Sequence, residues 1–232
     1  MKLRELFEAE NTHVSFCFGR MNPPTIGHKK LLDTVASIGG QYKIFLSQTQ
    51  DKKKNPLDYQ TKIKFVKAMF PNHAKNIVDD SGLNTIVKVA SFLYNMGYRN
   101  ATFVAGSDRL EEMKKLLQTY NGVEGKAHGY YKFDVLDFKS SGDREDGAEG
   151  VAGISASNAR AAAANDDFES FKASTGAGQY AEPLFKAVKA GMGIQEDAAG
   201  VGIITKQNST KDVGPGTIRK NLKAFNLVGE KK

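Results

Sequence analysis

The hydrophobic residues of positions 1–140 fall into short β-prone runs that alternate with longer segments of helical periodicity. Short runs bounded by turn residues predict strands, and five are expected, at 14–18, 42–47, 76–78, 101–105 and 133–138. Apolar positions three or four residues apart predict helices, and four are expected, at 26–37, 58–70, 84–95 and 107–117. This alternation predicts a parallel sheet wrapped on both faces, which is a Rossmann-like, doubly wound α/β fold.

Breaker and capping residues predict where these helices begin and end. Gly39 and Gly40 are expected to stop the first helix. Pro71 is expected to end the second, because proline has no amide hydrogen for the helix. Asn84 and Ser107 are expected to cap the third and fourth helices, since short polar side chains can accept from the free amides at a helix start.

The second part of the chain is predicted to be helical, with glycine-rich connections. Residues 139–153 are rich in glycine and charge and predict a loop, and C-terminal helices are expected near 155–164 and 179–190. The expected organisation is one domain over 1–190, a Gly-rich linker over 191–202 and a basic C-terminal tail over 203–232.

Composition excludes several classes of protein. A chain of 232 residues, 40% hydrophobic and 25% charged, can bury a core without disulfides or metals. The single cysteine, Cys17, excludes an intramolecular disulfide and any CxxC site. There is neither a run of apolar residues long enough for a transmembrane helix nor a signal peptide at the N-terminus. We therefore expect a cytoplasmic protein that does not act at a membrane.

The positive charge is concentrated near the C-terminus. The net charge is +7, and residues 197–232 contribute +4 of it through seven basic and three acidic residues. A solvated tail is the expected interpretation, and contact with nucleic acid or an acidic partner is the alternative. The mildly basic remainder suits an enzyme that handles phosphorylated metabolites.

A glycine- and proline-rich segment follows the first predicted strand and opens the first helix. In doubly wound folds, the crevice at the carboxyl ends of the strands is the usual ligand site. Gly19 and Gly27 allow a ligand to approach the backbone closely. The helix start presents unpaired amides and a partial positive charge, which suit a phosphate. Arg20 and His28 add side-chain donors, so the segment predicts an anion site.

Two later helix starts carry related chemistry. Gly106 and Asp108 follow the fourth predicted strand, where the carboxylate can accept from a ribose hydroxyl. Ser155 and Ser157 present hydroxyls at the start of a later helix, and Arg160 can reach back from the next turn to a phosphate. Each pattern alone is an ordinary helix start, so their weight comes from occurring together.

The first segment resembles the opening signature of the nucleotidyltransferase superfamily, G-x-F-x-P-x-H/T-x-G-H. Its core here is Thr25-Ile26-Gly27-His28, with threonine where some members have histidine. Residues 106–108 are similar to the family's G-S/A-D turn. Residues 154–160 are similar to its I-S-S-T-x-x-R signature, with alanine and serine in place of the second serine and the threonine. Residues 52–57 resemble the K-N-P-F/L stretch of the mononucleotide adenylyltransferase branch.

The resemblance implies a Rossmann-like domain with a polyphosphate site. It implies catalytic roles for His28, Thr25, Arg160 and Lys54, the last chosen among three lysines because it abuts the proline-fixed turn. It implies nucleotide binding by Gly19, Arg20, Met21, Asn22, Gly27, Gly106, Asp108, Ile154, Ser155 and Ser157. Mg²⁺ is the implied cofactor, and since it would be bound mainly by substrate phosphates, no metal ligand is assigned to the protein.

The implied reaction is transfer of AMP from ATP to a phosphorylated acceptor such as nicotinamide mononucleotide, with release of pyrophosphate. A cytidylyltransferase acting on a phosphorylated alcohol or sugar is one alternative, and a non-catalytic nucleotide-binding or structural module is another. The whole chain also resembles phage-encoded members of the superfamily, which would place it in the host cytoplasm or with the virion. A homo-oligomer is compatible with the sequence. His13, His73 and His128 are expected to be surface histidines.

Overall fold

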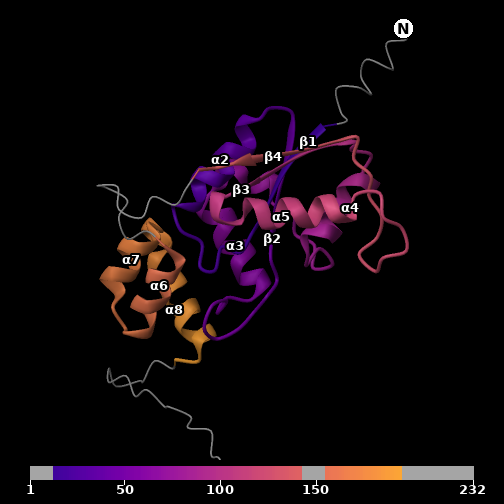
Figure 1. The fold of residues 1–232 in the computed structure, drawn as a ribbon. Helices are drawn as coiled ribbons and strands as arrows, with labels where there is room; N and C mark the ends of the chain where they lie inside the picture. The colour runs from indigo at the N-terminus through magenta and orange to yellow at the C-terminus, as the bar shows by residue number, and fades with distance from the viewer. Residues whose placement is uncertain (1–12, 143–154, 195–232) are drawn as a thin grey trace, which may run out of the picture. The chain divides into compact units, whose positions relative to one another are not determined.

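Four parallel strands form the centre of the fold, and they are hydrogen-bonded in the order β2-β1-β3-β4. They are β1 (His13–Gly19), β2 (Gln41–Leu46), β3 (Asn100–Ala105) and β4 (Val135–Ser140) (Figure 1). The computed structural model describes residues 13–142 and 155–194. Because the chain leaves β1 toward β2 and returns on the other side of β1 as β3, the connections diverge between β1 and β3. Doubly wound sheets bind ligands at such a divergence.

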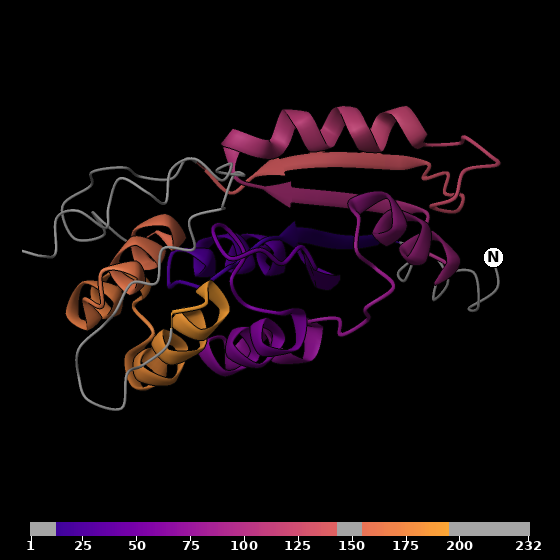
Figure 2. The same ribbon diagram turned by 90° about the horizontal axis from the view of Figure 1, so that it is seen from below.

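Helices cover both faces of this sheet, which confirms the predicted fold class (Figure 2). The helices between the strands are α2 (His28–Ser37), α3 (Tyr59–Met69), the short 3₁₀ helix η1 (Pro71–Asn76), α4 (Ile86–Asn95) and α5 (Ser107–Tyr120). The helices α4 and α5 pack on one face, while α2 and α3 pack on the other. The helices exclude water from both faces of the sheet, as is usual for a parallel sheet.

Alternating side chains of the strands supply the two halves of this core. Phe16 of β1 points to the face covered by α4 and α5, where its ring lies 5.2 Å from that of Phe103 and 6.5 Å from that of Phe45. The next residue, Cys17, is fully buried on the other face with Ile44. Burial raises the pKa of the Cys17 thiol to about 12, so this group is a small apolar core residue at neutral pH.

A bundle of three helices follows the sheet in the chain and forms a third hydrophobic cluster. Its elements are α6 (Ala156–Ala164), α7 (Phe168–Thr175), the 3₁₀ helix η2 (Gly178–Tyr180) and α8 (Ala181–Met192). Phe171 and Phe185 pack at its centre with ring centroids 5.0 Å apart. Leu57 and Phe65 belong to the same cluster, so the bundle packs against α3 and the loop before it (Figure 1).

Several expectations about elements are wrong. The strand expected at 76–78 does not form, because Pro71 starts a 3₁₀ helix and only Ile77 pairs, in a single bridge to Ile44. Thr85 caps α4 in place of Asn84, since Thr85 has the extended backbone of an N-cap and accepts from the Lys88 amide.

Further corrections concern a cap, a missed helix and a histidine. Ser107 is the first helical residue of α5, and Gly106 occupies the cap position without a side-chain bond. The helix α7 was not expected, because its eight residues carry too short an apolar pattern. His73 is buried, not exposed, and bonds to Tyr42 and Asp33. The expected helices near 155–164 and 179–190 are confirmed.

The loop expected at 139–153 starts later than predicted, because Lys139 and Ser140 pair with Val104 and Ala105 of β3 as the end of β4. Residues 143–153, most of the Gly-rich linker and the basic tail lie outside the described residues. Within 13–142 and 155–194, no helix is long and apolar enough to cross a bilayer.

Candidate functional site

The carboxyl ends of all four strands meet at one edge of the sheet, because the strands are parallel. The main chain joins neighbouring strand ends directly: Gly19 accepts from the Ser47 amide at 2.8 Å, and Ala105 accepts from the Ser141 amide at 2.9 Å. The connections after β1, β2, β3 and β4 therefore start side by side. Residues 20–27, 51–57, 106–109 and 140–142 form the rim of this edge.

His28 begins α2 and is oriented by Thr25. The Thr25 amide donates to Nδ1 of His28 at 2.9 Å, and the Thr25 hydroxyl lies 3.0 Å from the same nitrogen. The Thr25 carbonyl oxygen lies farther from Nδ1, at 3.2 Å. The shorter contact is with an amide, which can only donate, so it favours Nδ1 as the acceptor and Nε2 as the nitrogen that carries the proton of the neutral ring. The imidazole is half-buried, whereas Thr25 is 2% exposed. The geometry thus points the hydroxyl of Thr25 to His28, and a contact of Thr25 with phosphate stays a prediction.

Asn22 lies at the centre of the rim and is 1% exposed. Its side-chain nitrogen donates to the Leu57 carbonyl at 2.9 Å, and its side-chain oxygen accepts from the Leu57 amide at 3.0 Å. This pair joins residues 20–27 to residues 51–57 as a strand pairing would. Met21 is also buried, with φ of 40°, and packs under Gly19. Nucleotide binding by Met21 and Asn22 stays a prediction, since both side chains are enclosed by protein.

Arg160 reaches this rim from α6. Its guanidinium donates through Nη1 to the Asn22 carbonyl at 2.7 Å and through Nη2 to the Ser157 hydroxyl at 3.1 Å. Burial, and then the charge of Arg20, lower the pKa of Arg160 from its ordinary value. Ser155 caps α6 by accepting from the Asn158 amide at 3.0 Å. The residues of two distant motifs, 19–28 and 155–160, are therefore brought together, while Ile154 lies outside the described residues.

The three-helix bundle makes further contacts with residues 20–27 and with residues 51–57. The Ile26 amide donates to the Thr175 carbonyl at 2.7 Å. A Cβ built on Gly176 would lie 2.6 Å from a methyl group of Ile26, so only glycine fits there. A Cβ built on Gly191 of α8 would lie 2.0 Å from the Pro56 carbonyl oxygen. The bundle thus packs closely on residues 20–27 and on residues 51–57.

The three lysines of residues 52–54 lie on a turn that Asp51 organises. The Asp51 carboxylate accepts from the Lys53 amide at 2.9 Å, from the Lys54 amide at 2.6 Å and from the Asn55 side chain at 2.5 Å. These bonds, led by that from the Lys54 amide, lower the pKa of Asp51 to about 2. The side chains of the lysines are exposed. Which of them meets a ligand is not decided by this turn, so Lys54 stays a prediction.

Lys62 is a site candidate that the sequence reasoning missed. It lies in the first turns of α3 and is 0% exposed, and its ammonium donates to the Ser47 carbonyl next to the end of β2. Burial, and then the charge of Arg20, lower the pKa of Lys62 to about 8. A signal was present in the sequence, because Lys62 stands between the apolar positions of a helix whose neighbours Phe65 and Val66 are core residues.

The predicted G-S/A-D turn, residues 106–108, follows β3 and lies beside the end of β4. Ser107 and Ser140 join their hydroxyls at 2.7 Å, and the Ser107 amide donates to the Gly142 carbonyl at 3.4 Å. Asp108 is exposed in the first turn of α5. A Cβ on Gly106 would lie 2.8 Å from a carboxylate oxygen of Asp108, so glycine lets this carboxylate fold back on the strand end.

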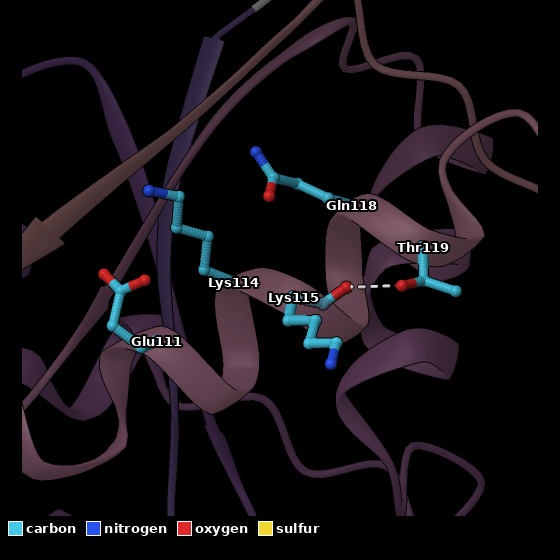
Figure 3. Close-up of a pocket in the computed structure, with 5 residues that line it drawn as sticks. All are labelled: Glu111, Lys114, Lys115, Gln118 and Thr119. Atoms are coloured by element: carbon cyan, nitrogen blue, oxygen red, sulfur yellow. Dashed lines mark hydrogen bonds between the residues drawn. The ribbon is translucent and has the colours of Figure 1, made fainter.

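A hollow of about 350 Å³ lies elsewhere, on the outer face of α5. Figure 3 shows its five lining side chains projecting from one helix, with the Thr119 hydroxyl bonded to the Lys115 carbonyl at 2.7 Å. The lining residues are Glu111, Lys114, Lys115, Gln118 and Thr119. None of them belongs to the predicted motifs, and the hollow is not the candidate site. Among the described residues, no group of three or more His, Cys, Asp or Glu side chains could hold a metal ion.

The fold and this rim define an α/β protein in which the helix start at its first βα junction and the guanidinium of Arg160 lie at the carboxyl edge of a parallel sheet. The model of the cytidylyltransferase-like family matches residues 16–142. That is more than half of the 232 residues, and the chain belongs to the cytidylyltransferase-like family, within the nucleotidyltransferase superfamily. No curated protein matches the chain. The family match includes the loops after β1, β2 and β3 and ends before α6, so Arg160 and the bundle lie beyond it.

Proposed function

We propose that this nucleotidyltransferase transfers AMP from ATP to a phosphorylated acceptor, with nicotinamide mononucleotide as the leading candidate, and releases pyrophosphate. One observation carries the proposal: Arg160, from a helix outside the family match, donates to the carbonyl of Asn22 in the loop that leads to His28. Arg160 and the loop that leads to His28, which are distant in sequence, thereby meet at the edge where a doubly wound sheet binds its ligands.

In the proposed reaction, a phosphate oxygen of the acceptor attacks the α-phosphorus of the triphosphate. A bond forms from that oxygen to the α-phosphorus, and the bond from the α-phosphorus to the bridging oxygen of the leaving pyrophosphate breaks. The nucleophile is already ionised at neutral pH, so no general base is needed. Catalysis then consists of in-line positioning and of neutralising the charge that grows on the phosphate oxygens.

The described residues have the chemistry for these tasks. His28 is held with Nε2 as its donor, which suits a hydrogen bond to an α- or β-phosphate oxygen. Arg160 and Ser157 are assigned to the leaving pyrophosphate, and Arg20 with Lys54 to the acceptor phosphate or the triphosphate. Mg²⁺ would arrive with the triphosphate and supply positive charge there, and no ligand for it is assigned to the chain.

A nucleotide panel tests this proposal most directly. Pyrophosphate release is measured with ATP, CTP, GTP and UTP against nicotinamide mononucleotide, phosphopantetheine and phosphorylated alcohols or sugars. The proposal expects release with ATP and nicotinamide mononucleotide. Release with CTP but not ATP would establish the cytidylyltransferase alternative instead.

The same panel separates a catalyst from a binding module. His28→Ala is the variant expected to lose turnover, and Lys75→Ala, which removes an exposed charge from η1, is the matched control. Tight triphosphate binding without pyrophosphate release from any acceptor would favour a non-catalytic nucleotide-binding module.

A further inference from the structure

Lys62 is a buried cation at the candidate site to which the proposed reaction gives no role. Lysine is almost never fully buried unless it is paired with an acid. Among the described residues, the ammonium of Lys62 has one hydrogen-bond acceptor, and it is the uncharged carbonyl of Ser47. The nearest acid on its own helix, Asp58, caps α3 instead, accepting from the Thr61 amide at 2.9 Å and the Thr61 hydroxyl at 2.6 Å.

Two hydrogen bonds connect Lys62 to Gly19, the last residue of β1, directly before residues 20–27. The ammonium bonds to the carbonyl of Ser47, and the amide of Ser47 donates to the carbonyl of Gly19 at 2.8 Å. Arg20 is the next residue, and it is exposed and forms no ion pair with the described part of the chain. The ammonium of Lys62 is therefore linked through the backbone of Ser47 to the residue that precedes Arg20.

The charges that face Lys62 are unbalanced. Arg20 acts on both Lys62 and Arg160, and in each case its positive charge lowers the pKa of its neighbour. Asp58 has the opposite, smaller effect on Lys62, and Asp51 has it on Arg160. Both carboxylates already accept several hydrogen bonds of their own turns. Three cations that repel one another in a partly buried setting create a site that an anion stabilises.

We propose that Lys62 couples phosphate binding to proton uptake: a polyphosphate held by Arg20 and Arg160 favours the ammonium form of the buried Lys62 side chain. This inference rests on the proposed function for the place of the polyphosphate. Lys62 is a positioning residue in it, because the side chain is enclosed and acts through Ser47 and through its charge. It makes no direct contact with the ligand.

The pH range of the effect follows from linkage. With a pKa of about 8, Lys62 is largely charged at pH 7 and largely neutral above pH 9 in the free protein. A bound anion raises this pKa, so binding takes up a proton at pH 8–9 and takes up almost none through Lys62 at pH 7. Affinity therefore falls as pH rises above about 8, by at most about tenfold per pH unit.

Other groups near Lys62 titrate outside this range. Arginine side chains stay protonated throughout this range. Asp51 and Asp58 have lowered pKa values and are ionised throughout. Tyr59, the neighbour of Lys62 on α3, has its pKa raised by burial above the ordinary value of 10. The difference between wild type and a Lys62 variant in the interval from pH 8 to 9 therefore reports on Lys62.

Isothermal titration calorimetry with the full chain tests the inference. ATP, without acceptor and with EDTA, is titrated at pH 7.0 and pH 8.5, each in two buffers of different ionisation enthalpy. We expect uptake of about 0.5 to 0.8 proton through Lys62 at pH 8.5, as a pKa near 8 in the free protein requires. Lys62→Met should remove this uptake, and Lys62→Arg should bind without a pH-dependent loss between pH 7.5 and 9, because its charge is permanent. Circular dichroism melts check that both variants fold.

The outcomes separate this inference from the proposed function. Equal proton uptake in wild type and Lys62→Met, or ATP binding without uptake in wild type, overturns the inference. Inorganic tripolyphosphate serves as a second probe, read as the difference between wild type and Lys62→Met. Uptake with tripolyphosphate but no pyrophosphate release from any nucleotide supports the inference and rejects the proposed reaction. If neither ATP nor tripolyphosphate binds, the inference is overturned and the proposal of a polyphosphate site is wrong as well.

Discussion

The two halves of the rim at the carboxyl edge of the sheet differ in how they are held. In the packed half, residues 20–27 and 51–57, the side chain of Asn22 bonds to the backbone of Leu57, and the three-helix bundle packs against both segments. The open half, residues 106–109 and 140–142, has mostly exposed side chains, and its two segments are joined by the hydroxyls of Ser107 and Ser140. The packed half is preorganised before any ligand arrives, whereas the open half can adapt to one. Substitutions in the packed half should therefore affect turnover or folding, and those in the open half should affect affinity.

The largest effect is expected at His28, which directly follows residues 20–27 of the packed half. His28→Ala removes a preorganised donor and should lower kcat by roughly two to three orders of magnitude. The free energy of unfolding should hardly change, because the imidazole is half-buried and water can replace it at the Thr25 amide. Steady-state kinetics and a thermal melt measure the two quantities, with Lys75→Ala as control. Normal turnover in His28→Ala would show that the assigned role is wrong.

A somewhat smaller loss is expected at Arg160. Arg160→Lys keeps the positive charge but cannot serve Asn22, Ser157 and a phosphate together, so kcat/KM should fall about 10- to 100-fold. The variant Lys172→Ala, on the exposed side of α7, should keep wild-type kinetics. If Arg160→Lys kept the kcat/KM of Lys172→Ala, the contact of α6 with residues 20–27 would have no part in the reaction.

Asn22 should show the structural cost of the packed half. Asn22→Ala leaves the amide and the carbonyl of Leu57 buried without partners, so the free energy of unfolding should fall by about 2 to 4 kcal/mol. Asn84→Ala, at an exposed position before α4, should change it by less than about 0.5 kcal/mol. Urea denaturation measures both. Equal stability of the two variants would contradict the view that Asn22 joins the loops.

The smallest effect is expected in the open half, at Asp108. Asp108→Ala should raise KM for the nucleotide several-fold, in line with about 1 kcal/mol for one exposed hydrogen bond, and leave kcat and stability unchanged. Glu111→Ala, one turn further along α5, is the matched control and should leave KM unchanged. A fall in kcat without a rise in KM would place Asp108 with the packed half instead.

Much of the fold could be predicted, because the necessary signals are local. The strands β1, β2 and β3 have short, mostly apolar, β-prone sequences, and each lies within one residue of its predicted range. Local signals fail where two neighbours compete or where a segment is short. Asn84 and Thr85 are both good caps, and only the backbone conformation of Thr85 decided between them. The eight residues of α7 are stabilised mainly by the bundle around Phe171.

The alternation of β1, β2 and β3 with helices, the family motif at 19–28 and the serines and arginine at the start of α6 could be recognised from the sequence alone. Only the tertiary structure decided that Arg160 bonds to Asn22 across 138 positions and that Asn22 pairs with Leu57 across 35. It alone decided that Lys62 is buried behind the first loop. The physical reason is that periodicity encodes which face of an element is apolar. Which polar group meets another depends on how the finished elements pack.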